Sequence, residues 1–359
     1  MSLISLTREA RRVRKTFGIG LWQQFIEAFH LRYGGTQLDP WEYYFFQVYL
    51  PKFDAKEKRS FAGWRRELTI DRLANCGQRE VANNKLTFHQ LMSENSLPVP
   101  VIQAVFGATV DQHDRIPSLT DKEGLQALLL NSSAAFIKPV RGARGKSIFV
   151  SERTSANKLR ITADTGEQID LPGLTAKIEN SAKAGYLIQE HLQTHPSIAA
   201  ICGNRLTSTR LLIVNGYNGP EIISAVWRCP VGQNMTDNFD AGRKGNLIAD
   251  INLTSGAIRR IIQGAGWRNI EIDAHPDTGA PLSKLIIPDW QQLTATCLQA
   301  AALLNELRLQ HWDVAITNHG PVLLEVNVEG GMRTHQIVQQ RGIVRAQLAE
   351  LLEECMRTE

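Results

Sequence analysis

Apolar residues recur at two different periods along this chain of 359 residues, and the change of period divides it. In the first 80 residues the spacing is helical, and Asp39-Pro40 is a typical helix start, because Asp caps a helix and proline favours its first position. One apolar helix face is formed by Leu21, Trp22, Phe25, Ile26 and Phe29. The pattern predicts a helical N-terminal domain over residues 1–80.

From residue 81 onward, short apolar strands alternate with helical segments, which is typical of an α/β (α+β) organisation. Helices are expected over residues 122–131, 174–184, 289–307 and 343–356. We therefore expect a second domain over residues 81–345, followed by the end of a C-terminal helix at residues 346–359.

Two strands around an Asn-His-Gly turn are predicted near the C-terminus. Side chains alternate along a strand, so Glu325 and Asn327 point the same way, and pairing through the turn brings Asp313 alongside them. Two carboxylates and an amide oxygen suit Mg²⁺ and leave positions for phosphate oxygens. The alternative is a surface hairpin with ordinary polar residues. The apolar Leu323 and Leu324 weaken that alternative, because they make Glu325 follow a buried run.

A basic glycine loop lies between two further apolar strands. Its glycines, Gly142 and Gly145, let backbone N–H groups turn toward an anion. Its cations, Arg141, Arg144 and Lys146, add positive charge for phosphate oxygens. The loop matches neither a P-loop nor the dinucleotide fingerprint, because a strand follows it where those motifs have a helix. It predicts a phosphate-binding flap.

In this order, these segments resemble the ATP-grasp fold over about residues 81–340. The resemblance is carried by Lys138-Pro139 with its flap, the hinge strand at residues 186–191 and the terminal acidic set. The entry segment also fits, since Lys85 opens a helix before Pro98-Val99-Pro100.

Two branches of that superfamily are similar to particular parts of the chain. The ending Glu325-x-Asn327…Gly331-Met332-x-x-His335 resembles D-alanine–D-alanine ligases. The middle is closer to the sugar-transfer-associated ATP-grasp family, which is associated with cell-surface polysaccharide biosynthesis. Its marks are His195-Pro196, Thr209-Arg210, Asp237-Asn238-Phe239, Gly242 and the run 312–317. Family members usually begin with a small α/β domain, so a helical start leaves the acceptor site unplaced.

The resemblance implies ATP and Mg²⁺ as cofactors, with Mn²⁺ as an alternative ion. It assigns the metal to Asp313, Glu325 and Asn327. It assigns the nucleotide to Lys85 and Lys138, to the flap residues Arg141, Gly142, Arg144, Gly145 and Lys146, to the hinge residues Gln189, Glu190 and His191, and to Asn238 on the opposite wall.

Two arginines interrupt apolar strands, and the resemblance gives them catalytic roles. Arg210 and Arg228 each need an anion, because an unpaired buried charge is costly. That anion is a phosphate, a substrate carboxylate or a structural acid, and the sequence favours the first two. His311 takes the place of an arginine that supports the oxyanion in D-alanine–D-alanine ligases. The backbone N–H groups of residues 330–332 form a turn that can help bind an anion.

The activity implied is that of an ATP-dependent carboxylate–amine ligase acting through an acyl phosphate. Its partners would be a small carboxylate and an amine, either of them sugar-linked in the polysaccharide setting. A phosphotransferase acting on a sugar or small metabolite in the same cleft is the alternative.

Composition and charge limit the classes of function and the cellular locations that remain to be considered. A net charge of +4 does not indicate a nucleic-acid binder, and no apolar run approaches the length of a membrane span. Five scattered cysteines without a C-x-x-C pair favour reduced thiols, so a cytoplasmic location is expected. The basic cluster that begins at Arg8 is explained most simply as a solvated helix face, with membrane-surface contact through residues 8–30 as the alternative.

Overall fold

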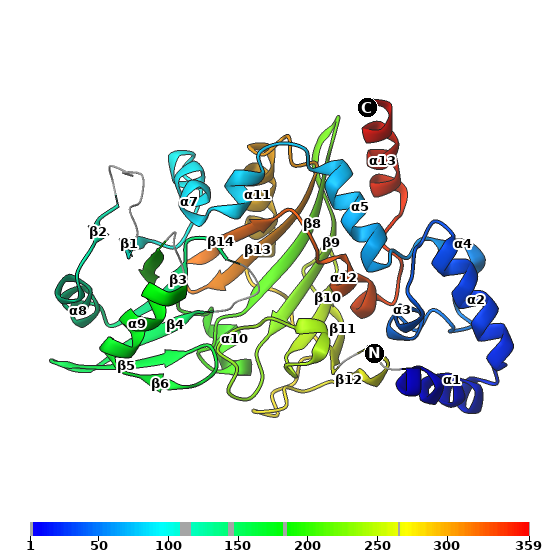
Figure 1. Ribbon diagram of the computed structural model, residues 1–359, viewed down its shortest axis with the longest axis horizontal. Helices are drawn as coiled ribbons and strands as arrows, with labels where there is room; N and C mark the ends of the chain where they lie inside the picture. Colours follow the sequence, from blue (N-terminus) through cyan, green and yellow to red (C-terminus); the bar gives the residue numbers. More distant parts are fainter. Residues whose placement is uncertain (1–2, 108–115, 143–146, 182–184, 265, 359) are drawn as a thin grey trace.

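The computed structural model describes residues 3–107, 116–142, 147–181, 185–264 and 266–358. Within these residues, two seven-stranded sheets lie side by side and a group of helices packs at one end of the molecule (Figure 1). This arrangement confirms the expected α/β class. No helix among the described residues combines the length and apolar character needed to cross a bilayer.

Helices alone make up the described chain before the first strand. They are α1 (Leu3–Phe17), α2 (Leu21–Tyr33), α3 (Pro40–Phe45), α4 (Ala55–Arg59), α5 (Trp64–Ala74), α6 (Arg79–Asn83) and α7 (Lys85–Glu94). As the sequence predicts, α3 starts at Pro40, and Asp39 and Glu42 form a capping box there.

The first sheet has the strand order β2-β1-β7-β3-β4-β5-β6. Its strands are β1 (Ile102–Phe106), β2 (Ser118–Leu119), β3 (Ala134–Pro139), β4 (Phe149–Ser155), β5 (Lys158–Ala163), β6 (Gln168–Ile169) and β7 (Tyr186–Glu190). One face is covered by α8 (Lys122–Asn131) and α9 (Leu171–Ser181), which bury Leu125 and Leu174 against Ile137.

The second sheet is antiparallel, with the order β12-β11-β10-β9-β8-β13-β14. Its strands are β8 (Ser208–Gly216), β9 (Gly219–Cys229), β10 (Leu247–Ile251), β11 (Ile258–Gln263), β12 (Ile270–Glu271), β13 (Leu309–Thr317) and β14 (Gly320–Asn327). The remaining elements are α10 (Pro196–Cys202), α11 (Trp290–Ala302), α12 (Met332–Gln339), α13 (Ala346–Thr358) and the 3₁₀ turns Asp240–Gly242 and Gly266–Arg268.

The two faces of the second sheet have different cores. One face packs on α7 and α11, where Trp312 meets Phe88 with ring centroids 5.8 Å apart. The other face packs on α12 and on the N-terminal helices, so that Tyr43 shares a core with Val226 and Ile248. The N-terminal helices therefore border the face of the sheet that carries the candidate site.

Helix ends differ from the predicted ones by a few residues. Helix α8 matches its predicted range, whereas α9 begins at Leu171, and the predicted end at 182–184 lies outside the described residues. Helix α11 ends at Ala302, and α13 begins only at Ala346. Before α13 begins, the N–H of Val344 donates to the carbonyl of Ser60 over 2.9 Å.

Candidate functional site

Strands β13 and β14 pair around the predicted turn and gather polar side chains on one face. Asp313 lies opposite Glu325, and His311 lies opposite Asn327. Residues directly opposite on antiparallel strands share a face, as do residues two apart along one strand. The three predicted metal ligands therefore lie together, on the face turned away from Trp312.

Asp313 is held by both arginines that the sequence singles out. Arg210 donates from Nε to Oδ1 and from Nη2 to Oδ2, each over 2.7 Å, and Arg228 Nη2 lies 3.1 Å from Oδ2. Burial alone would raise the pKa of Asp313, but the two guanidinium groups outweigh it and keep that pKa well below its usual range.

Arg228 has further partners on the same face. Its Nη2 donates to Ser208 Oγ over 2.6 Å, and its Nε lies 3.7 Å from Asp237. The sequence favours phosphate or substrate as the anion for these arginines. In the structure that anion is a protein carboxylate, so a ligand would have to share the guanidinium groups with Asp313.

The oxygen atoms of Asp313, Glu325 and Asn327 are the kind of ligand that a hard cation such as Mg²⁺ prefers. Glu325 keeps 33% of its side chain exposed, and Asn327 Nδ2 lies 3.3 Å from Glu325 Oε1. A carboxylate oxygen has two lone pairs, so Asp313 can accept from arginine and still face an ion. No group of three or more His, Cys, Asp or Glu side chains in the described ranges is arranged to hold a metal. The candidate set consists of two carboxylates and an amide, with positions left for phosphate or water.

Two lysines, one on α7 and one on β3, interact with the carboxylate of Glu325. Lys85 Nζ, at the start of α7, donates to the carbonyl of Gly142 over 2.8 Å and lies 3.9 Å from Glu325 Oε2. Burial and, to a smaller extent, the charge of Lys85 lower the pKa of Lys138 to about 8, and the charge of Glu325 partly opposes them. Groups from α7, β3 and β14 therefore converge where the two sheets meet.

The flanks of the flap are as predicted, since β3 and β4 pair in antiparallel fashion. Arg141 Nη1 donates to Glu80 Oε2 over 3.2 Å at the base of the loop. The predicted phosphate contacts Arg144, Gly145 and Lys146 lie outside the described residues.

The hinge joins the first sheet to the second. Gln189 is buried in β7, and Glu190 Oε1 accepts from the N–H of Val101 over 2.8 Å, so the Glu190 side chain already has a protein partner. Burial lowers the pKa of His191. The N–H of His195 donates to Ile316 in β13, and its ring accepts from the N–H of Ser197 as the cap of α10.

Asn238 lies in the loop that follows β9. Its Oδ1 accepts from the N–H of Asp240 over 3.2 Å, and its carbonyl accepts from Asn246. The neighbouring Asp237 contacts Ser208 and Arg228, so this loop closes one side of the arginine pair.

The sequence did not predict the contribution of helix α5. Glu67 Oε1 accepts from the N–H groups of Gly331 and Met332 over 2.6 and 2.8 Å, and Asp71 Oδ2 accepts from Gly330 over 2.8 Å. The N–H groups of this turn therefore bind anionic groups, and these groups are the carboxylates of Glu67 and Asp71 on α5. The signal was present in the sequence, because Glu67 and Asp71 share the buried face of α5 with Ile70.

His311 belongs to the same buried layer. Its Nε2 lies 3.4 Å from Asp71 Oδ1, and both side chains are 0% exposed. A Cβ at Gly331 would come within 3.0 Å of His311 Nδ1, so glycine allows the turn to approach the ring. His311 thus supports the turn from behind.

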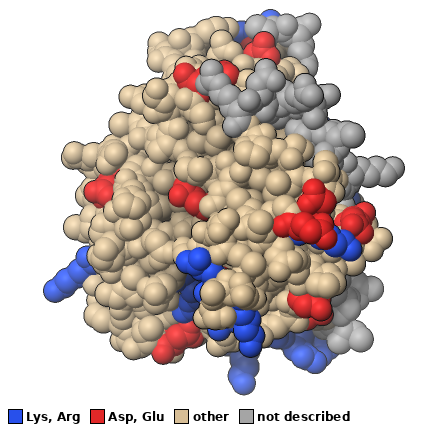
Figure 2. Space-filling model, turned by 90° about the vertical axis from the view of Figure 1, so that its left-hand side faces the viewer, with Lys and Arg blue, Asp and Glu red and all other residues tan. Residues whose placement is uncertain are grey.

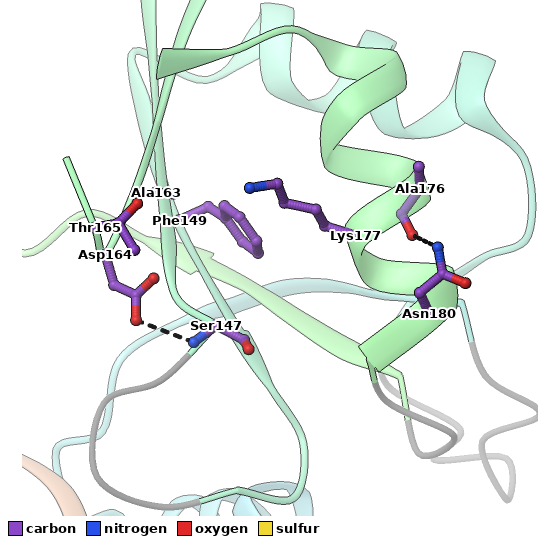
Figure 3. Close-up of a pocket in the computed structure, with 8 residues that line it drawn as sticks. All are labelled: Ser147, Phe149, Ala163, Asp164, Thr165, Ala176, Lys177 and Asn180. Atoms are coloured by element: carbon purple, nitrogen blue, oxygen red, sulfur yellow. Dashed lines mark hydrogen bonds between the residues drawn. The ribbon is translucent and has the colours of Figure 1, made fainter. Parts of the chain in front are cut away.

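One cavity lies apart from these residues. It has a volume of about 340 Å³ and opens between β4–β5 and α9 (Figure 3). Its lining includes Phe149, Lys177 and Asp164, whose Oδ2 accepts from the N–H of Ser147 over 3.2 Å. None of the predicted site residues lines it. Seen from the end that carries the first sheet, acidic and basic side chains are scattered over the part of the surface that the structure describes (Figure 2).

Comparison with known proteins agrees with this geometry. Residues 68–350 match the protein family described as sugar-transfer associated ATP-grasp. None of the curated proteins matches the sequence.

Several solved structures are similar in fold. An ATP-grasp ligase, PsnB, in complex with a minimal precursor, is 15% identical with a TM-score of 0.40, over 80% of this chain and 64% of that one. An N5-carboxyaminoimidazole ribonucleotide synthetase in complex with ADP is 11% identical with a TM-score of 0.41, over 76% and 52%. D-alanyl-alanine synthetase A from Vibrio cholerae O1 biovar eltor is 12% identical with a TM-score of 0.44, over 77% and 65%. This chain thus spans between half and two thirds of the length of these three proteins, and the likeness is loose.

Proposed function

Because the chain belongs to the sugar-transfer associated ATP-grasp family, we propose that it is an ATP-dependent carboxylate–amine ligase. A substrate carboxylate oxygen attacks the γ-phosphorus of ATP, which gives an acyl phosphate and ADP. An amine then attacks the acyl carbon, phosphate leaves, and the nitrogen loses a proton as the amide bond forms. Such chemistry depends mainly on positioning and on neutralising charge.

The convergence of Lys85, Lys138 and Glu325 carries this proposal. Two cations and an acid from separate elements meet at the junction of the sheets, which is what a bound triphosphate and its metal ion require. Lys138 is only 8% exposed, so its ammonium lacks water to solvate it, and phosphate oxygens would replace that water.

The remaining residues divide into a metal side and a substrate side. Asp313, Glu325 and Asn327 would hold Mg²⁺, or Mn²⁺ in its place, which supplies charge neutralisation at the β- and γ-phosphates. Arg210 and Arg228 orient Asp313 and present further N–H donors beside it. His311 is fully buried, so we assign it a positioning role behind the turn at Gly331 rather than a contact with substrate.

The substrate class follows from the family description. We propose that a sugar carries the carboxylate or the amine, as in the assembly of surface polysaccharides. The hinge backbone next to Glu190 would hold the adenine edge, because the side chain of Glu190 is engaged with Val101.

The decisive experiment is ADP release with pairs of substrates, in which uronic acids and amino acids are each offered with amino sugars or amino acids. We expect ADP only when a carboxylate is present, and a product whose mass equals the two substrates minus water. Hydroxylamine in place of the amine should trap the acyl phosphate as a hydroxamate. A phosphorylated product formed without any amine would overturn the ligase proposal in favour of a phosphotransferase.

A further inference from the structure

The outer surface of α2 is unusual for a folded chain. Among the described residues, thirteen large apolar side chains are strongly exposed, and seven of them lie within residues 17–33. These seven are Phe17, Leu21, Trp22, Phe25, Ile26, Phe29 and Tyr33. Trp22 is 71% exposed and Tyr33 is 75% exposed. Exposed apolar residues are ordinary when they are scattered, but a contiguous group marks an interaction surface.

The group is contiguous, and we call it the aromatic face. The ring centroids are 5.5 Å apart for Trp22 and Phe25, 6.3 Å for Phe25 and Phe29, and 4.6 Å for Phe29 and Tyr33. The opposite side of the helix is fixed to the protein, since the hydroxyl of Tyr44 in α3 donates to Oε1 of buried Gln24 over 3.0 Å. Helix α2 is therefore anchored on one side and bare on the other.

A row of basic side chains lies on the neighbouring helix. Arg8, Arg11, Arg14 and Lys15 of α1 are exposed and form no ion pair within the part of the chain that the structure describes. Arg12 differs, because its Nε lies 2.6 Å from Glu9. Helices α1 and α2 contact each other at the end of the molecule opposite the first sheet (Figure 1).

We propose that α1 and α2 dock this protein on an anionic membrane surface. The aromatic face would enter the boundary between headgroups and acyl chains, and the basic row of α1 would meet the lipid phosphates. A helix with bulky apolar residues on one face beside Lys and Arg lies in the plane of the interface. With 13 residues, α2 is about 20 Å long, which is too short to span a bilayer.

Charge distinguishes a membrane from a second copy of this chain. In a two-fold dimer, both subunits present the same surface, so two unpaired basic rows would approach each other beside the aromatic faces. An anionic membrane would neutralise those cations instead. The residues of the aromatic face and of the basic row are not part of the candidate site, so the inference does not depend on the proposed chemistry.

Vesicle sedimentation tests the proposal with the full chain. We expect binding to vesicles of phosphatidylcholine mixed with phosphatidylglycerol, much weaker binding to pure phosphatidylcholine, and a loss of binding as salt is added. The double variant Trp22→Ser/Phe25→Ser should lower the partition coefficient by about tenfold or more, because it removes two inserted rings. Arg11→Glu/Lys15→Glu should abolish the preference for the anionic lipid.

Matched controls separate this surface from general stickiness. Ile286→Ser removes an apolar side chain that is 58% exposed, as Phe25 is, and should leave binding unchanged. Lys122→Glu/Lys158→Glu makes the same charge change at the other end of the molecule and should weaken binding far less than Arg11→Glu/Lys15→Glu. Equal effects of test and control variants would overturn the proposal. The proposal would also be overturned if the wild type did not bind the vesicles and light scattering showed that it forms a dimer which Trp22→Ser dissociates.

Discussion

Arg210 and Asp313 face each other through two parallel hydrogen bonds, from Nε to Oδ1 and from Nη2 to Oδ2, both 2.7 Å long. Asp313 is also bound by Arg228, which has a second carboxylate partner in Asp237 at 3.7 Å, so two carboxylates balance two guanidinium groups. Removing a single partner from such a group leaves buried charge uncompensated.

We predict that Asp313→Asn lowers the free energy of unfolding by about 3 kcal/mol, because Arg210 loses its carboxylate partner and Arg228 loses one of two. Urea unfolding would measure it. Glu152→Gln is the control, since its pair with Arg160 lies at the surface and should cost less than about 1 kcal/mol. Equal stability of the two variants would show that the arginines do not depend on Asp313.

The proposed metal ligand Glu325 gives a second prediction. Glu325→Gln should reduce ADP formation by about 100-fold or more with little change in melting temperature, because a third of the side chain is exposed to solvent. Asn327→Ala should behave similarly. Glu329→Gln, which alters a surface pair with Arg79, is the matched control and should stay active. Near-normal turnover in Glu325→Gln would remove this residue from the metal site.

Glu67 gives a prediction about stability. Its Oε1 accepts from the N–H groups of Gly331 and Met332, so Glu67→Ala strands two donors in a buried place. We expect a loss of about 2–4 kcal/mol in the free energy of unfolding. Glu67→Gln keeps an acceptor oxygen and should recover much of that loss. If the two variants were equally unstable, the charge and its interaction with Arg333 would matter more than the turn.

The pKa of Lys138 predicts a pH dependence of stability. It is about 8 in the folded chain, lowered by burial and by Lys85 from 10.5. Between these pH values the unfolded chain holds a proton that the folded chain lacks, so stability rises with pH, by at most about 3 kcal/mol. Below pH 8 both states are protonated and this slope vanishes. The difference in unfolding free energy between wild type and Lys138→Met, measured against pH, should follow this curve, and a flat difference would contradict it.

ATP should reverse that pKa shift, because phosphate oxygens favour the charged ammonium. We expect nucleotide binding above pH 8 to take up a proton, detectable by calorimetry in buffers with different ionisation enthalpies. Lys138→Met should abolish the proton uptake and weaken ATP binding far more than it lowers the melting temperature. Unchanged affinity would place the nucleotide elsewhere.

Local sequence patterns predicted the strands of the site but not the ion pairs that connect them. The alternation around Glu325 and the turn before it are short-range signals, and β13 and β14 pair as expected. The contact between Arg210 and Asp313 depends on the register of β8 against β13, which residues 103 apart in the chain cannot reveal by periodicity. Arginine in an apolar strand therefore predicted that an anion is needed, but the sequence favoured a phosphate or a substrate where the structure has Asp313.

The N-terminal helices show a similar limit. Helical spacing predicted the apolar face of α2, but a period reports which side chains share a face and not what covers them. Phe25 is 58% exposed, whereas Ile70 on α5 is buried. Glu67 and Asp71 likewise share a face of α5 with Ile70, but that spacing does not show that the turn at Gly331 packs against them.

The hydrogen bonds between α5 and the turn at Gly331 also have a consequence for the order of folding. Glu67 and Gly331 are 264 residues apart, so the contact closes a very long loop, whereas β13 and β14 form a local hairpin. During synthesis the N-terminal helices leave the ribosome first. Glu67 and Asp71 cannot form these hydrogen bonds until the last strands and the turn have been synthesised. Completion of the turn is thus a late step in folding, and a chain cut short before Gly331 would leave both acids without their partners.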